Sequence, residues 1–90
     1  MKVIWKYKLI IIDVQELQMP FEAEILSTQI QDDIICLWAK VDSQQKLYKR
    51  CIQIIGTGNP IDETFNVSRV FIDTVQLDGF VWHIFERIIK

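Results

Sequence analysis

The sequence predicts a small all-β protein, an antiparallel sandwich or partly open barrel of about six strands in one domain spanning residues 1–90. Short segments in which apolar and polar side chains alternate recur along the chain. Turn-forming dipeptides, Asp32-Asp33 and Asp78-Gly79, separate the clearest of these segments. Half of the residues are hydrophobic and 24% are charged, which excludes a disordered chain.

The N-terminal segments predict two strands. Residues 3–9 place Val3, Trp5, Tyr7 and Leu9 on one face and lysines on most of the other, which is typical of a half-buried strand near a sheet edge. Residues 14–20 predict a second short strand that ends at Met19-Pro20, because proline cannot donate a hydrogen bond into a ladder.

Residues 24–31 and 34–41 predict a hairpin around Asp32-Asp33, although this dipeptide is also compatible with a longer loop. The two-residue turn sets Gln31 opposite Ile34. The expected cross-strand pairs are then Ile30 with Ile35, Gln29 with Cys36, Thr28 with Leu37, Ser27 with Trp38, and Leu26 with Ala39.

Residues 47–55 predict the next strand, which leads into the glycine-rich stretch 56–60. The following stretch, 61–68, has no sustained period, and we expect a loop there that Phe65 anchors into the core.

The last hairpin is expected between residues 70–77 and 80–86, around Asp78-Gly79. The expected pairs are Val75 with Trp82, Thr74 with His83, and Ile72 with Phe85. Apolar residues at 81, 84, 85 and 88 also fit a helical period, so a short C-terminal helix is the alternative to the strand.

Charge and composition narrow the classes of function. A net charge of −2 and a pI near 5.2 argue against general DNA or RNA binding. No segment approaches the apolar length of a membrane span, and we expect a protein of the cytoplasm. The two cysteines, Cys36 and Cys51, are expected to be buried thiols. The high apolar fraction suggests that part of the surface contacts another chain, as in a homo-oligomer.

The stretch "GTGNP" at residues 56–60 is expected to form a structural turn, with a ligand-contacting loop as the alternative. It matches neither a Walker loop nor the GxGxxG pattern, but its glycines allow close backbone approach, and Thr57 and Asn59 offer polar side chains.

Catalysis and metal binding are not expected. In the predicted register the only histidine, His83, faces Thr74, while Asp73 points to the opposite face of the sheet. His83 is therefore a candidate for a structural or ligand-binding hydrogen bond, and the spacing of histidine and cysteines fits no metal site. The three tryptophans are expected mainly in the core, with base stacking as an alternative role.

Four blocks together resemble a family of small proteins of unknown function encoded by tailed bacteriophages. They are "IWKY", "AEILSTQIQDDIICLWAKVD", "IIGTGNPI" and "DGFVWHIFE". Asn59 stands where the family's turn has a histidine, and Asp33 stands where its hairpin has a glycine. The resemblance implies an accessory phage protein in the host bacterial cytoplasm, without enzymatic activity or cofactor.

From these observations we expect a β-rich homo-oligomer that sequesters a small nucleotide-derived immune signal, of the cyclic-nucleotide or ADP-ribose type. The alternatives are an inhibitor that binds a host defence or metabolic enzyme and, less favoured, a virion accessory. The candidate ligand-binding residues are Trp5 for stacking, Arg50 and Arg69 for phosphate, and Thr57, Asn59 and His83 for hydrogen bonds.

Overall fold

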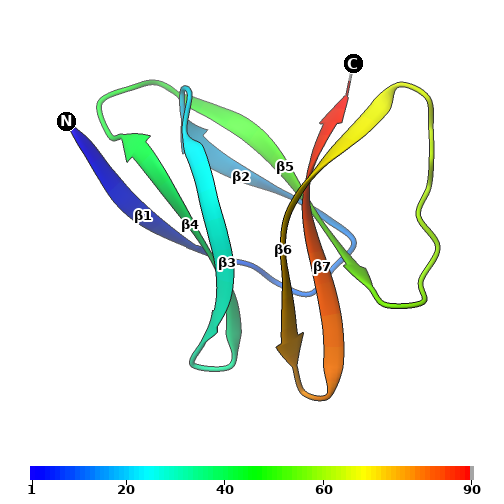
Figure 1. Ribbon diagram of the computed structural model, residues 1–90. Coiled ribbons are helices and arrows are strands. Elements are labelled where there is room, and N and C mark those ends of the chain that lie inside the picture. Colours follow the sequence, from blue (N-terminus) through cyan, green and yellow to red (C-terminus); the bar gives the residue numbers. More distant parts are fainter. Residues whose placement is uncertain (90) are drawn as a thin grey trace.

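The computed structural model describes residues 1–89 as seven β-strands without a helix (Figure 1). The strands are β1 (Lys2–Lys8), β2 (Val14–Pro20), β3 (Glu24–Gln31), β4 (Ile34–Asp42), β5 (Leu47–Gly56), β6 (Val67–Leu77) and β7 (Phe80–Ile89). The predicted all-β class is confirmed, with seven strands in place of about six. Within these residues no helix is long and apolar enough to cross a membrane. The C-terminal segment is a strand, so the helical alternative is wrong.

The strands form two open antiparallel sheets. Sheet A has the order β1-β4-β3, and sheet B has the order β2-β5-β7-β6. Strand β1 is an edge strand, as its lysines predict. In Figure 1 the edge strands β3 and β6 lie next to each other, and across this seam the backbone N–H of Thr28 donates to Oδ2 of Asp73 at 3.2 Å. One side-chain acceptor thus links two sheet edges that share no backbone ladder in the described chain.

The hairpin between β3 and β4 has the predicted turn. Asp32 and Asp33 have φ values of 52° and 61°, as a two-residue turn of the primed type requires, so the longer loop is wrong. The predicted pairs from Gln31–Ile34 to Ser27–Trp38 are confirmed. The pair of Leu26 with Ala39 is wrong, because a bulge shifts the register and sets Ile25 opposite Ala39.

The hairpin between β6 and β7 also has the predicted turn, and a bulge also shifts its register. Its turn has positive φ at Asp78 (54°) and Gly79 (82°), and the pairs of Val75 with Trp82 and Thr74 with His83 are confirmed. A bulge between Phe71 and Asp73 makes the pair of Ile72 with Phe85 wrong, and sets Phe71 opposite Phe85 instead. Bulges insert one extra residue that alternation alone does not reveal.

The core lies between the inner faces of the two sheets. Strand β4 of sheet A contributes every second residue from Ile35 to Val41. Sheet B contributes mainly Met19, Ile52 and Ile84, and all of these side chains are at most 1% exposed. The expectation that Phe65 anchors the loop at residues 61–68 into the core is wrong, because its side chain is 97% exposed. Cys36 is buried, Cys51 is half-buried, and both are free thiols.

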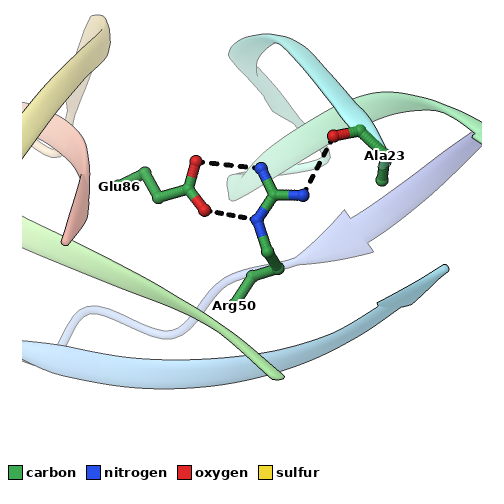
Figure 2. Close-up of polar contacts among 3 residues, drawn as sticks. All are labelled: Ala23, Arg50 and Glu86. Atoms are coloured by element: carbon green, nitrogen blue, oxygen red, sulfur yellow. Dashed lines mark hydrogen bonds and ion pairs between the residues drawn. The ribbon is translucent and has the colours of Figure 1, made fainter. Parts of the chain in front are cut away.

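An ion pair lies between the sheets (Figure 2). Arg50 of β5 and Glu86 of β7 form a bidentate ion pair. Nη2 of Arg50 donates to Oε1 of Glu86 at 2.9 Å, and Nε donates to Oε2. The remaining Nη1 donates to the backbone oxygen of Ala23, just before β3, at 2.9 Å. The hydrogen bond to Glu86 raises the pKa of Arg50, which keeps the guanidinium charged. We call these three residues the Arg50 clamp; it joins sheet B to the start of β3.

We predict that Arg50→Lys destabilises the protein by about 1–3 kcal/mol, because an ammonium cannot make the two-pronged contact and also reach Ala23. Urea unfolding measures the effect. Lys40→Arg, in an exposed pair with Glu24, serves as the control and is expected to change nothing. An Arg50→Lys midpoint equal to that of the wild type would contradict the role of the clamp.

A second, independent prediction concerns Tyr7 of β1, whose hydroxyl is buried and has no hydrogen-bond partner within residues 1–89. Tyr7→Phe removes this unpaired group and is expected to raise stability, by roughly 1 kcal/mol. Burial also raises the pKa of Tyr7, so the unfolded chain loses the phenolic proton first as the pH rises. Wild-type stability should therefore fall above about pH 10, and Tyr7→Phe should weaken that fall. A Tyr7→Phe protein that is less stable at pH 7 would show that the hydroxyl has a partner.

Candidate functional site

A pocket lies at one end of sheet B, between the turn after β5 and the turn that joins β6 to β7. Its volume is about 430 Å³, and it is lined by Gly56, Thr57, Asn59, Gly79, Phe80, Val81 and Trp82. Both walls come from the paired strands β5 and β7, whose ladder ends at Gly56 opposite Trp82. The β5–β7 register therefore fixes the position of the two walls. We call this hollow the turn pocket.

The first wall is held by backbone hydrogen bonds. The N–H of Thr57 donates to the oxygen of Val81 at 3.1 Å, and the N–H of Asn59 donates to the oxygen of Gly56 at 3.0 Å. Gly58 has a φ of 90°, which favours glycine in the turn. Gly56 is required for a different reason, since a Cβ there would lie 3.0 Å from Nδ2 of Asn59 and 3.1 Å from Cζ3 of Trp82.

The second wall is aromatic. The rings of Phe80 and Trp82 are 5.7 Å apart between centroids and inclined by 35°. Phe80 is 63% exposed at the rim, whereas Trp82 is half-buried and packs against the core. The indole Nε1 of Trp82 is buried and has no hydrogen-bond partner in the described part of the chain. This wall offers flat apolar surface to a planar ligand.

His83 does not line the turn pocket, but it is hydrogen-bonded to Thr57, which does. Its Nε2 is 2.7 Å from Oγ1 of Thr57, and its Nδ1 is 3.1 Å from Oγ1 of Thr74. Thr57, His83 and Thr74 are arranged like the nucleophile, base and orienting group of a catalytic triad. The group in the third position, however, is the neutral hydroxyl of Thr74. A neutral group can fix the tautomer of an imidazole but supplies no charge to stabilise an imidazolium. The arrangement is best suited to positioning Thr57.

The candidate residues divide into two groups. Thr57, Asn59 and His83 come together at the turn pocket, and the GTGNP stretch is both a turn and a pocket wall. The other three lie elsewhere: Trp5 packs against the core from β1 in sheet A, Arg50 belongs to the clamp, and Arg69 is held by Gln53 and the backbone of Asp62. No described lysine or arginine lines the turn pocket.

Sequence reasoning missed Phe80 and the steric role of Gly56, and it placed Trp82 mainly in the core. The signal was present in part, because the predicted turn at Asp78-Gly79 fixes residues 80 and 82 on one face. The proximity of Gly56 depends on β5 pairing with β7, a contact between strands that are not neighbours in sequence. Among residues 1–89 no group of three or more His, Cys, Asp or Glu side chains is placed to hold a metal ion.

Fold and site together define an all-β domain of two open antiparallel sheets with an aromatic-walled pocket at the end of one sheet. The chain belongs to the family described as Domain of unknown function (DUF7352), whose model matches residues 1–90. No curated protein and no solved structure matches the chain. The family membership confirms a whole-chain relation to a family of unknown function, while the phage origin stays a prediction.

Gly56→Ala should close the turn pocket without unfolding the protein, because the φ of Gly56 is not positive and the atoms nearest to the new methyl group belong to the side chains of Asn59 and Trp82. We expect the indole N–H signal of Trp82 and the side-chain amide signal of Asn59 to shift in NMR spectra. Gly79→Ala is the control: its φ of 82° makes the change cost about 1 kcal/mol, but no atom lies within 4 Å of the added methyl. Unmoved Asn59 and Trp82 signals in Gly56→Ala would contradict the geometry of the first wall.

Proposed function

We propose that this protein is a non-enzymatic binding protein that sequesters a small nucleotide-derived signal in the turn pocket. In this proposal it is a phage-encoded anti-defence protein of the host bacterial cytoplasm, and the ligand is of the cyclic-nucleotide or ADP-ribose type. The observation that carries the proposal is the aromatic wall of Phe80 and Trp82 facing the amide of Asn59.

The chemistry of the walls suits a nucleobase. A base is flat and stacks on aromatic rings, a contact worth roughly 1–3 kcal/mol. Its edge carries donors and acceptors that the amide of Asn59 can pair with, since no hydrogen bond within the described chain occupies that side chain. The pocket volume of about 430 Å³ falls within the usual range for small-molecule sites.

Recognition of a ligand's phosphate at the turn pocket requires a second copy of the chain. The turn pocket has no cationic lining residue in the described structure, whereas a nucleotide-type ligand carries negative charge. A homo-oligomer would supply a lysine or arginine across the interface and would cover the exposed ring of Phe80. Other large apolar side chains are also more than 40% exposed and support association, among them Ile10, Phe21, Leu47, Tyr48, Val70 and Phe71.

One observation favours a protein-binding inhibitor as the second candidate. Phe65 projects from the 57–66 segment with 97% of its surface exposed, next to Ile61, which is 46% exposed. A lone aromatic side chain on a loop is a common anchor at protein–protein interfaces. In this alternative the host protein would cover Phe65, and the turn pocket would be incidental.

A thermal-shift panel tests the main proposal with a cyclic dinucleotide, ADP-ribose and AMP. A ligand that binds only the folded state raises the Tm, and we expect at least one of the first two to raise it by several degrees while AMP does not. Asn59→Ala should abolish this shift. Asn66→Ala is the matched control, because Asn66 lies outside the pocket lining, and it should preserve the shift.

Sedimentation at micromolar concentration completes the test, because the proposal requires an oligomer. A monomer that no member of the panel stabilises would contradict sequestration. If, in addition, one host protein is retained from lysate by the wild type and lost with Phe65→Ala, the inhibitor alternative takes its place.

A further inference from the structure

Two arginines lie directly opposite each other on the outer face of sheet B. Arg69 of β6 and Arg87 of β7 are cross-strand partners in the ladder, and both are half-buried. Like charges in this arrangement destabilise a sheet, because their Cβ atoms are only about 5 Å apart. We call Arg69 and Arg87 the arginine pair. Hydrogen bonds to Gln53 and Asp62 hold Arg69 in place, but these neutral oxygens do not offset the charge of the pair.

No carboxylate of residues 1–89 neutralises the arginine pair. The ion pairs within this range join Arg50 with Glu86, Lys40 with Glu24, and the N-terminus with Asp42. Arg69 instead donates to neutral oxygens, from Nε to Oε1 of Gln53 at 2.7 Å and from Nη2 to the backbone oxygen of Asp62 at 2.6 Å. The Nε of Arg87 is buried and has no hydrogen-bond partner among residues 1–89.

The orientation of Arg69 is built by a relay of side chains. Gln53 is 5% exposed, and its Nε2 donates to Oδ1 of Asp13 at 2.9 Å, which turns its Oε1 toward Arg69. Arg69 is therefore held across β7 by the central strand β5 while its Nη1 has no partner among the described residues. A guanidinium held by neutral groups keeps its charge available to an anion.

A third cation extends this surface. Lys49 precedes Cys51 by two residues on the same face of β5, and Cys51 is the ladder partner of Arg87. Lys49 and Arg87 line one hollow of about 310 Å³, and Arg69 lines a neighbouring hollow of about 390 Å³. Several acidic residues lie nearby. Glu86 lines the hollow of Lys49 and Arg87 and is paired with Arg50, and Glu16 is the other ladder partner of Cys51. Glu63 lines the hollow of Arg69, Asp62 contacts Arg69 through its backbone oxygen, and Asp13 accepts from Gln53.

We propose that the arginine pair, together with Lys49, is a binding site for the phosphate group of a small molecule. A phosphate between two guanidinium groups accepts several charge-assisted hydrogen bonds and removes the repulsion between Arg69 and Arg87. Three cations are too few to follow a nucleic-acid backbone, and the net charge of the chain opposes one. The ligand is therefore a compact phosphate or diphosphate.

This site is separate from the turn pocket of the same chain. Trp82 and Arg87 are five residues apart along β7, which corresponds to roughly 17 Å in an extended strand. Their side chains also point to opposite faces of the strand, because an odd number of positions separates them, so a ligand stacked on Trp82 does not reach Arg87. The inference consequently stands whether or not the turn pocket binds a base.

Thermal unfolding with inorganic pyrophosphate tests the site, against sodium chloride of equal ionic strength. We expect an excess of pyrophosphate to raise the wild-type Tm by about 5 °C or more beyond the chloride sample. Arg87→Gln should raise the Tm in the absence of anion, because it removes the like-charge contact, and should lose most of the pyrophosphate shift. Arg69→Gln should lose the shift as well.

Two control variants give the result its specificity. Lys8→Gln removes an exposed cation from sheet A and should preserve the shift, as should Asn59→Ala in the turn pocket. The proposal is overturned if Arg87→Gln keeps the wild-type shift, or if chloride produces the same shift as pyrophosphate. It is also overturned if a short DNA duplex binds more tightly than pyrophosphate and Arg87→Gln abolishes that binding.

Discussion

The pairing of β5 with β7 is the contact on which the other features depend. These strands are separated in sequence by the whole of β6, and their ladder runs from Cys51 opposite Arg87 to Gly56 opposite Trp82. At one end the register brings Arg50 within reach of Glu86, and the clamp then holds the start of β3. At the other end it sets the glycine-rich turn against the aromatic wall. One register therefore positions both the link between the sheets and the candidate site.

The small size of the chain explains why polar groups lie between the two sheets. A domain of this length buries only about 60% of its unfolded surface, so few side chains are enclosed on all sides. The Arg50 clamp and the contact of Thr28 with Asp73 replace a backbone ladder between the sheets near β3 and β6. The outer face of sheet B has a similar polar arrangement, in which Asp13, Gln53 and Arg69 connect three segments distant in sequence.

Local chemistry made the strands and turns predictable, whereas long-range pairing did not follow from it. Asp-Asp and Asp-Gly fixed two hairpins, because their backbone conformation determines the register next to the turn. The predicted hairpin registers are wrong at Leu26 and Ile72. A bulge adds one residue at each position, and the alternation of apolar and polar side chains does not reveal it. Phe65 was assigned to the core by hydrophobicity alone, yet the segment that carries it does not pack inward. Thr57 and Asn59 are visible as turn residues, and the predicted hairpin sets His83 opposite Thr74, but the contact of His83 with Thr57 depends on the pairing of β5 with β7. Their role in ligand binding stays a prediction.

An NMR measurement of proton distances shows whether Gly56 faces Trp82 across the β5–β7 ladder. We expect strong nuclear Overhauser contacts between the α-protons of Gly56 and the ring protons of Trp82 around Cζ3, because a Cβ at Gly56 would lie 3.1 Å from that carbon. Ring contacts of Trp82 with Ile54 in place of Gly56 would reveal a two-residue shift in the β5–β7 register. That result would remove the turn pocket and would show that the register described for β5 and β7 is wrong.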